Sequence, residues 1–473
     1  MPIFRCPWWL ILGSVLIPAI YIPMLWSPFD CTEDSCIVYP PEGTFPTNLF
    51  HAVASSTLHE FKTTGPFRPV TWAHWHAAAG LFGPDPVARR VARLVWCGFA
   101  TATLLLLLTE FGTQPGAALL VAAFVQWNPF RSEIWISLAM PEAYAMPYAM
   151  LALVCALRAS RAVHQQRWDA AGVILLLLCL GIKNVFIALI PPLVWLRLMA
   201  GSRPWRLQMG GAVCYLALSI LPLIHFVWLK IAPTPEQYTI RWSVLNVLHF
   251  GRALYSTFAI GVTWPALLLL FVLVPLRELK RFRVELIAAG LLFLAGFIVY
   301  LPIPMMYSRY TMPSVWGLDL LLALSLTVAL SAPLVFHRLT VGVLFVMLLV
   351  IGWRGLLRQD EIIMRNRLNW QALLDLEQRA EQGTSVAVVY PSGTTTFRDI
   401  SQGEAFHLVT HLRMRGRSRA ELQITTTPQD ATLLLAGERF DPGSGYNLVR
   451  EFKAERTLFG SAHRCRLWRR EKS

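Results

Sequence analysis

Carboxylates are concentrated in one short segment of the 473-residue chain, FDCTEDSC, which places Asp30, Glu33 and Asp34 within five positions. A carboxylate can remove the proton of a hydroxyl group, so that the oxygen attacks a carbon atom. Acidic clusters in loops are also common as plain solvated surface, and this alternative stays open here. Among the three residues, Asp34 is the first candidate for a base, with Glu33 and Asp30 as alternatives.

Basic side chains mark three further segments: Arg68 before Pro69, Lys183 between two apolar stretches, and Arg309 beside Tyr310. Cations of this kind hold an anionic phosphate leaving group. Together with a carboxylate base they suit attack of a hydroxyl on a sugar carbon, through an oxocarbenium-like transition state, as a lipid-linked phosphate departs. The alternative is that these side chains anchor helix ends at lipid headgroups.

Four other polar residues are candidates for the same site: Arg131, Glu133, Glu142 and His74. Glu133 and Glu142 could equally cap helix N-termini, where negative charge is favourable. His74 and His76 are two residues apart, a spacing that fits neither a zinc-binding helix nor a zinc finger. The sequence therefore assigns no metal ligands.

The composition places these residues in a membrane protein. The apolar fraction is 55%, the charged fraction is only 15%, and the mean hydropathy is +0.49. Soluble domains carry about 25% charged residues, so an ordinary soluble enzyme and a disordered chain are both excluded. The net charge of +14 is expected in cytoplasmic loops, and we expect no nucleic-acid partner.

Apolar runs long enough to span a bilayer recur along most of the chain. A spanning helix needs about 20 mostly apolar residues, and about eleven segments qualify if short ones are included. The fold class we expect is an α-helical polytopic membrane protein. The predicted segments are 8–26, 88–109, 115–127, 143–157, 169–182, 184–200, 208–230, 253–276, 285–301, 313–334 and 339–356.

Lysine and arginine in short loops predict the orientation of these helices. The basic loops 158–168, 197–207 and 277–283 fall on one side, which we assign to the cytoplasm. The large first loop 27–87 and the segment 128–142 then fall on the outer side, together with the other candidate residues. In a bacterium this would be the periplasmic face of the inner membrane.

The character of the chain changes after residue 356. Charge rises, 361–380 has the pattern of an amphipathic helix, and the runs 385–390, 431–436 and 446–452 are typical of strands. We predict a membrane domain over 1–356 and a small extracytoplasmic α+β domain over 357–473.

Several short motifs, in order along the chain, resemble those of membrane glycosyltransferases of the GT-C superfamily, including the protein O-mannosyltransferases. The family has an acidic pair after its first helix, then an Arg-Pro-aliphatic step, a Leu-Phe-Gly turn, a proline step followed by glutamate, a lysine step before a helix, and an Arg-Tyr-x-x-Pro-Ser step. The matching residues are Glu33, Asp34 and Ile37; Arg68, Pro69 and Val70; Leu81, Phe82, Gly83 and Pro86; Asn128, Pro129 and Glu133; Ile182, Lys183, Asn184 and Pro191; and Arg309, Tyr310, Pro313 and Ser314.

The resemblance implies a GT-C-like fold and a polyprenyl-phosphate-linked sugar donor. It places the catalytic base at Asp34, with Arg68, Lys183 and Arg309 contacting donor phosphate or acceptor. The acceptor would be a glycan, a lipid-linked sugar or a protein hydroxyl, and transfer would invert the configuration. Some members use a divalent metal such as Mg²⁺ or Mn²⁺ and others do not, so the resemblance leaves metal dependence open.

The chain departs from the family pattern at several positions. The usual Asp-Asp pair is Glu33-Asp34, and Asn184 stands where the family has glutamate. The region that often carries a histidine has Arg90 and Cys97 instead, and the tail shows no tetratricopeptide repeats. These departures leave the sugar and the acceptor open.

Two other functional classes remain as alternatives. A multispan transporter or flippase would place polar residues at mid-membrane on broken helices, often with internal repeat symmetry. Here the polar residues lie at one boundary and large outer loops dominate, which favours an enzyme. A non-catalytic scaffold would explain the tail but not the ordered motifs.

Cys31 and Cys36 flank the acidic pair on the side that we assign as oxidising. One hypothesis is that they form a disulfide that ties the acidic loop; two free thiols are the open alternative, because the spacing permits a bridge but does not require one. Alkylation of the untreated protein, followed by mass spectrometry, should label neither cysteine unless a reductant is added first. Labelling of both without reductant would reject the bridge.

Overall fold

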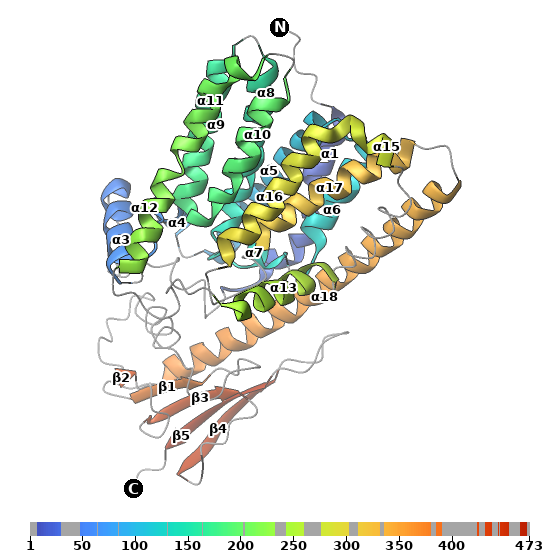
Figure 1. Ribbon diagram of the computed structural model, residues 1–473. Coiled ribbons are helices and arrows are strands. Elements are labelled where there is room, and N and C mark those ends of the chain that lie inside the picture. The colour runs from blue at the N-terminus through green and yellow to red at the C-terminus, as the bar shows by residue number, and fades with distance from the viewer. Residues whose placement is uncertain are drawn as a thin grey trace.

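The computed structural model contains a bundle of membrane-sized helices and a small β-sheet, joined by one long helix (Figure 1). It describes residues 7–29, 48–63, 65–83, 85–129, 131–162, 164–201, 204–231, 243–259, 276–301, 311–331, 335–379, 385–389, 423–424, 431–437, 443, 445–453 and 464–470. The helical elements are α1 (Trp8–Leu16), η1 (Pro18–Trp26), α3 (Leu49–Thr63), α4 (Pro69–Phe82), α5 (Pro86–Glu110), α6 (Pro115–Trp127), α7 (Glu133–Ile136), α8 (Glu142–Arg161), α9 (Gln165–Ile182), η2 (Asn184–Leu189), α10 (Ile190–Met199), α11 (Trp205–Ala217), α12 (Ile220–Ile231), α13 (Val244–Ala259), α15 (Leu276–Leu279), η4 (Lys280–Phe282), α16 (Arg283–Tyr300), α17 (Met312–Ser331) and α18 (Val335–Arg379).

Within these ranges, eight helical stretches are long and apolar enough to cross a membrane. They are Trp8–Trp26, Pro86–Glu110, Glu142–Arg161, Gln165–Ile182, Gln208–His225, Lys280–Tyr300, Met312–Ser331 and Val341–Leu376, and two shorter apolar helical stretches cover Pro115–Trp127 and Asn184–Met199. Each of these ten overlaps a predicted segment. The remaining predicted segment, 253–276, lies mostly outside the described residues, so the total of eleven stays a prediction.

Helices α8 and α17 form the centre of the bundle. In each, 78% of the most apolar 18-residue window is buried within the protein, against 22% for the stretch formed by α11 and α12. Small residues explain the close packing of α8, because Ala145, Ala149 and Ala152 on this helix are fully buried. The peripheral helices instead expose apolar side chains, as a lipid-facing surface requires.

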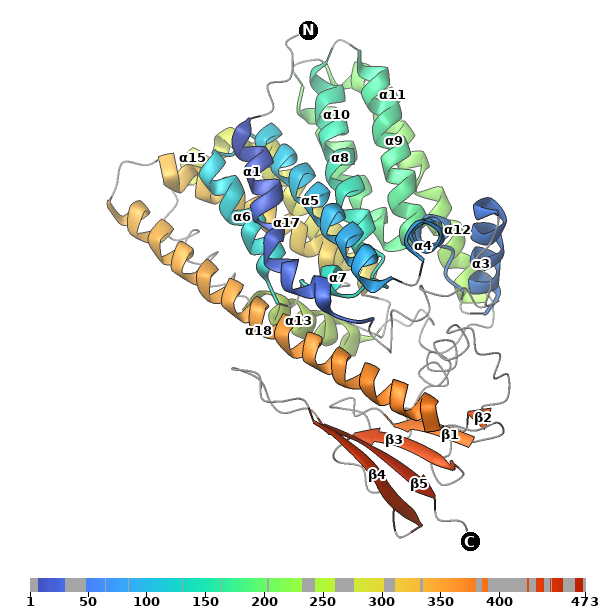
Figure 2. The ribbon, with the colours of Figure 1, turned by 180° about the vertical axis from the view of Figure 1, so that it is seen from behind.

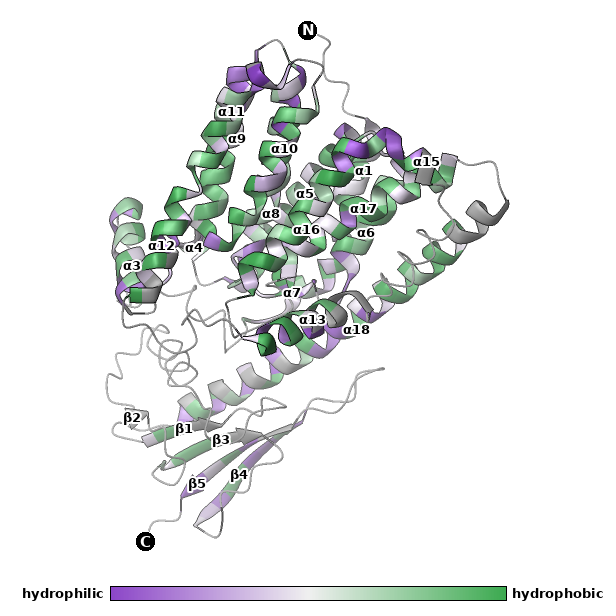
Figure 3. Cartoon of the chain, viewed as in Figure 1, coloured by the Kyte–Doolittle hydropathy of each residue, from purple (hydrophilic) through white to green (hydrophobic). Residues whose placement is uncertain are grey.

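The predicted cytoplasmic loops lie together at one end of the bundle, which we call the basic end. Arg161 at the end of α8 forms an ion pair with Glu285 at the start of α16 at 3.4 Å. Arg197 on α10 binds Asp169 on α9 at 2.7 Å, and Figure 3 shows hydrophilic residues at this end of α9 and α11. The opposite end of the bundle carries α4 and α7 and faces the sheet (Figures 1 and 2); we call it the sheet-side end.

The long helix α18 passes from the bundle to the sheet without a break (Figure 2). The predicted boundary at residue 356 therefore falls inside a helix of 45 residues. Leu348 and Ile351 of α18 belong to the core of the bundle, whereas Leu368 and Leu376 pack against the sheet.

The sheet has the strand order β2-β1-β3-β5-β4. Strands β1, β2 and β3 pair in parallel, and β5 pairs antiparallel with both β3 and β4. The bounds are β1 (Ser385–Val389), β2 (Gln423–Ile424), β3 (Leu433–Gly437), β4 (Tyr446–Lys453) and β5 (Arg464–Arg470). Strands β1, β3 and β4 coincide with the predicted runs, and one face of the sheet is covered by the last turns of α18.

The packing of α17 on α16 depends on Gly317. A β-carbon at this position would lie 2.5 Å from the Ala289 carbonyl oxygen and 2.7 Å from the Phe293 amide nitrogen, both on the backbone of α16. We expect Gly317→Ala to lower the melting temperature of the detergent-purified protein, since overpacking costs about 1–3 kcal/mol.

Gly290 on α16 provides the matched control, because a β-carbon there has no neighbour within 4 Å. Gly290→Ala should leave the melting temperature unchanged or raise it slightly, since alanine is the better helix former. Equal melting of the Gly317→Ala protein and the wild type would contradict the close packing.

Candidate active site

Five predicted site residues lie outside the described part of the chain: Asp30, Glu33, Asp34, Arg309 and Tyr310. The structure describes the residues that lead into and out of their segments. Phe29, directly before Asp30, is 1% exposed and packs with Trp75 and Leu138. Thr311, directly after Tyr310, is also buried. Both attachment points lie at the sheet-side end.

Lys183 occupies a break between two helices at this end. Helix α9 ends at Ile182, Lys183 has extended backbone angles (φ −160°, ψ 127°), and η2 begins at Asn184. The break turns the lysine side chain toward α8, where Nζ lies 2.5 Å from Glu142 Oε1. The two predicted candidates therefore form one ion pair, with Glu142 almost fully buried.

Glu142 is well placed to receive this cation. It is the first residue of α8, where the helix dipole favours negative charge. A buried charge is tolerated when it is paired and hydrogen-bonded. The pair thus keeps a lysine ammonium group in a partly buried position at this end of the bundle.

The segment around Arg68 is joined to the same break. Thr71 Oγ1 donates to the Ile182 carbonyl oxygen at 3.0 Å, and Val70 lies against Gly181. Arg68 itself forms an ion pair with Glu60 on α3, and Trp72 Nε1 also donates to Glu60, at 2.9 Å. Arg68 is therefore near Lys183 in the fold but already has a carboxylate partner.

His225 of α12 links the helix break at Lys183 to the residues that precede Arg68. Its ring is hydrogen-bonded to the Asn184 side chain through Nδ1, and its Nε2 lies 2.7 Å from the Gly65 carbonyl oxygen. The position at which this chain departs from the family glutamate, Asn184, is thus part of the local packing.

Arg131 and Glu133 lie in the segment between α6 and α8. Arg131 is 2% exposed and bonds Asp319 of α17 at 2.5 Å, so the two side chains hold the loop against the central helix. Glu133 is half-buried and begins α7. Phe186 of η2 stacks on Trp316 of α17 at 5.8 Å, which joins the lysine break to the same helix.

His74 packs among aromatic rings between α4 and α8. Its ring stacks on Tyr144 at 4.2 Å, and its Nε2 lies 3.0 Å from the Tyr148 hydroxyl oxygen. His76, by contrast, contacts Ser56 Oγ of α3 at 2.9 Å. The two imidazoles face different partners, and the described residues contain no group of three or more metal-ligating side chains.

Two arginines of α5 bind the loops around the site through backbone carbonyls. Arg90 donates to Ser27, Pro28 and Ile136. Arg93 donates to Leu138 and Met140 and lies over the Tyr144 ring at 4.4 Å.

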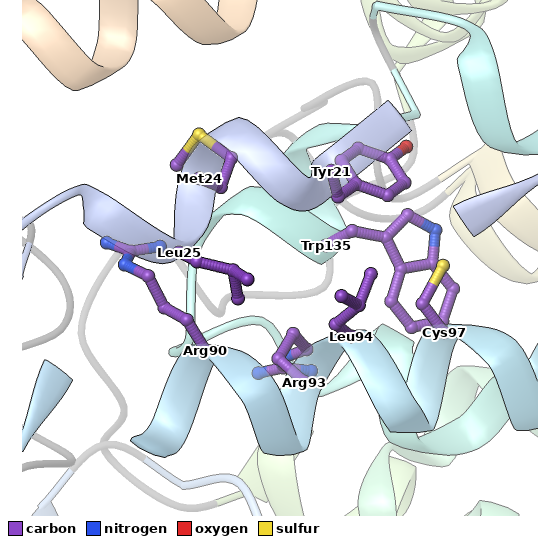
Figure 4. A pocket seen from close by; sticks show the side chains of 8 residues that line it. All are labelled: Tyr21, Met24, Leu25, Arg90, Arg93, Leu94, Cys97 and Trp135. Carbon is purple, nitrogen blue, oxygen red and sulfur yellow. The ribbon is translucent and has the colours of Figure 1, made fainter. Parts of the chain in front are cut away.

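A pocket adjoins these arginines between η1, α5 and α7 (Figure 4). Arg90, Arg93, Leu94 and Cys97 line it from α5, opposite Tyr21, Met24, Leu25 and Trp135. None of these eight residues carries a carboxylate, so the pocket cannot supply a carboxylate base.

Several residues at this end were not among the predicted site residues: Glu60, Arg90, Arg93 and Asp319. Asp319 carried a signal, because an acid inside an apolar segment is costly and invites explanation. Arg90 and Arg93 stand at the start of an apolar run, where arginine is expected as an interfacial anchor. Glu60 lies in a polar helix and had no distinguishing pattern.

No protein-family model and no curated protein matches the sequence. Among solved structures, ArnT from Cupriavidus metallidurans in the apo state aligns with a TM-score of 0.51 and 13% identity over 97% of both chains. The same protein bound to undecaprenyl phosphate aligns with a TM-score of 0.50 and 12% identity over 98% of both chains. An oligosaccharyltransferase from Archaeoglobus fulgidus aligns with a TM-score of 0.47 and 12% identity, over 91% of this chain and 66% of that one.

ArnT and the archaeal oligosaccharyltransferase are GT-C glycosyltransferases. At this level of identity, the likeness to ArnT shows a shared fold over nearly the whole of both chains. The predicted α-helical polytopic membrane architecture is confirmed in this coarse form, and the chain is an integral membrane protein.

The environment of His74 predicts a pH-dependent stability. Helix α4 is not among the candidate membrane spans. Burial, with a smaller contribution from the Arg93 guanidinium, lowers the pKa of His74 from 6.5 to about 4. Between these values the unfolded chain binds more protons than the folded one, so the free energy of unfolding falls as the pH drops from 6.5 toward 4.

We expect His74→Phe, which keeps an aromatic ring but cannot titrate, to reduce this dependence. The measurement is the melting temperature of the detergent-purified protein at pH 7 and pH 5. The wild type should lose more stability than the variant between the two values. An equal loss in both proteins would show that the His74 imidazole is not held in its neutral form.

Proposed function

We propose that the protein is a membrane glycosyltransferase that moves a sugar from a polyprenyl-phosphate-linked donor to an acceptor on the outer face of a membrane. The observation that carries the proposal is the similarity to ArnT over 98% of both chains, ArnT having been solved with undecaprenyl phosphate bound. The grouping of Lys183, Glu142 and the Arg68 segment at one end of the bundle gives that fold a charged site. The acceptor would be a glycan, a lipid-linked sugar or a protein hydroxyl.

In the proposed reaction, the Asp34 carboxylate takes the proton of the acceptor hydroxyl while the hydroxyl oxygen bonds to the anomeric carbon of the sugar. The bond from that carbon to the phosphate oxygen breaks, and the electron pair leaves with the polyprenyl phosphate. A single displacement of this kind inverts the configuration. Glu33 and Asp30 are the alternatives for the base.

Lys183 is the described residue best suited to the phosphate. Its Glu142 partner holds the ammonium group at the helix break, and a phosphate oxygen can bind a further ammonium hydrogen while that pair persists. Arg309 and Tyr310 are proposed to contact the phosphate from the segment before α17. Arg68, which is paired with Glu60, would contribute by sharing its guanidinium with donor or acceptor.

We assign Arg131 and His74 to positioning rather than to chemistry. Arg131 is enclosed with Asp319 of the central helix α17. His74 stacks on Tyr144 and packs among other aromatic rings. Glu133, the first residue of α7, remains a candidate. No reaction step is derived through a divalent metal, Mg²⁺ or Mn²⁺, because the described residues offer no ligand set for one.

The orientation proposed from the basic loops agrees with this site. The loops with Arg161 and Arg197 gather at the basic end, and Lys183 lies at the opposite end of α9. If the basic end faces the cytoplasm, the site opens on the outer side, which in a bacterium is the periplasmic face of the inner membrane. The part over 357–473, carrying the sheet, would then also be extracytoplasmic.

The test is transfer by purified full-length protein in nanodiscs, supplied with a panel of hexosyl and pentosyl polyprenyl phosphates and candidate acceptors. We expect release of free polyprenyl phosphate with one of the donors. Asp34→Asn should lower that release by about 10²–10⁴-fold, the usual contribution of a general base. Glu278→Gln, which removes an exposed acid near the basic end, is the matched control and should retain the wild-type rate.

Wild-type rates in both Asp34→Asn and Glu33→Gln would overturn the assignment of the base. The competing function, a transporter or flippase of lipid-linked glycans, makes a different prediction. It would give accumulation of an unchanged substrate across proteoliposomes, with no covalent product from any donor.

A further inference from the structure

Arg90 of α5 is buried, being 4% exposed, and bonds two segments that are far apart in the chain. Its Nε donates to the Ser27 carbonyl oxygen at 2.8 Å, and its Nη2 donates to that of Pro28 at 2.7 Å. Its Nη1 donates to the carbonyl oxygen of Ile136 at 2.9 Å. Each nitrogen of one guanidinium group therefore serves a loop carbonyl.

Arg93, one turn further along α5, continues the same contact. It donates to the carbonyl oxygens of Leu138 and Met140. It also lies over the ring of Tyr144, two residues after Glu142. The loop between α7 and α8 is thus held along its length by one face of α5.

The segment 27–29 is fixed from other directions as well. Asn366 Nδ2 of α18 donates to the Ser27 side-chain oxygen at 3.2 Å. Phe29 is enclosed by Trp75 and Leu138. This segment leads directly into the acidic residues of the first outer loop, and the Arg93-held loop leads directly into Glu142, the partner of Lys183.

We propose that Arg90 is a positioning residue of the transfer reaction: it fixes the segment 27–29, which precedes the acidic residues, against the end of α7, from which the chain leads to Glu142. The inference rests on the proposed function, in which a carboxylate of the first loop and Lys183 act on one donor. Arg90 touches neither the donor nor the reacting atoms. Its effect is to fix the separation of the two segments that carry the reacting groups.

An arginine is required because the acceptors are three carbonyl oxygens on two loops. The planar guanidinium group presents five N–H donors in a fixed fork, whereas lysine has a compact ammonium group on a flexible stem. Arg90→Lys keeps the charge but cannot reproduce the fork. The variant therefore removes the geometry while keeping a cation in the same place.

The test compares Arg90→Lys with Arg197→Lys in the transfer assay. Arg197 is equally buried, at 2% exposed, and makes bonds to Asp169 and Gln208 at the opposite, basic end of the bundle. Misplacement of reacting groups by about 1 Å can cost on the order of 10²-fold in rate, and we expect a kcat loss of that order in Arg90→Lys. The donor KM should stay within about twofold of the wild type, because the groups that bind the donor remain.

Arg197→Lys should lower the melting temperature without a comparable fall in kcat per folded protein. If Arg90→Lys and Arg197→Lys lost kcat by the same factor, Arg90 would be a general stabilising residue and not a positioning residue. Wild-type kcat in Arg90→Lys would overturn the proposal outright.

Hydrogen exchange of the full-length protein supplies a measurement that does not depend on activity. In Arg90→Lys, peptides covering 24–29 and 136–140 should exchange faster than in the wild type, while those of α10 and α11 stay unchanged. Unchanged exchange in both loops would reject the contact itself, even in an active enzyme. Absence of transfer in the wild type would instead reject the proposed function and with it the catalytic role, while faster loop exchange would still establish that Arg90 holds the two loops.

Discussion

Buried arginines that bond backbone carbonyls order the sheet-side end of the helix bundle. The segments there are irregular, and their carbonyl oxygens have no helix or sheet partners, so they need donors from elsewhere if they are removed from water. Arg90 meets this need for three carbonyls and Arg93 for two more. Hydrogen bonds to charged groups contribute about 1.5–3 kcal/mol each. The buried face of α5 thereby sets the positions of segments that have little regular structure of their own.

The helix break at Lys183 fulfils a complementary requirement. A lysine within an apolar helix would be expensive unless its charge were paired. Ending α9 at Ile182 lets the side chain reach Glu142, whose own charge is favoured by the α8 N-terminus. The Lys183–Glu142 pair is close to neutral overall. A bound phosphate would therefore be the one net negative charge at the site, whereas beside an unpaired Glu142 it would be the second. The break therefore provides a cation at the sheet-side end of the bundle without leaving an isolated charge there.

The sequence predicted the helices well because long apolar runs leave few other structures in a membrane. It also placed Lys183 at the junction of two segments, since a lysine and an asparagine interrupt an apolar run. It could not predict that Lys183 pairs with Glu142, that Arg68 pairs with Glu60 or that Arg131 pairs with Asp319, because such choices depend on how distant helices pack. The role of Arg90 was hidden for another reason: its partners are carbonyl oxygens, and every residue type has one. The outcome for Asp34 and Arg309 stays a prediction, since their segments lie outside the described residues.

The division of the chain at residue 356 shows where composition and structure diverge. The charge of the chain rises there, yet neither a proline nor a loop interrupts α18, and Ile363 still belongs to the core of the bundle. The same helix contributes Ile351 to the bundle core, Asn366 to the bond with Ser27, and Leu376 to the sheet. The residue types along a helix change where its surroundings change from apolar to polar, but the helix need not end there. Because Asn366 bonds Ser27, α18 also contacts the segment that Arg90 holds.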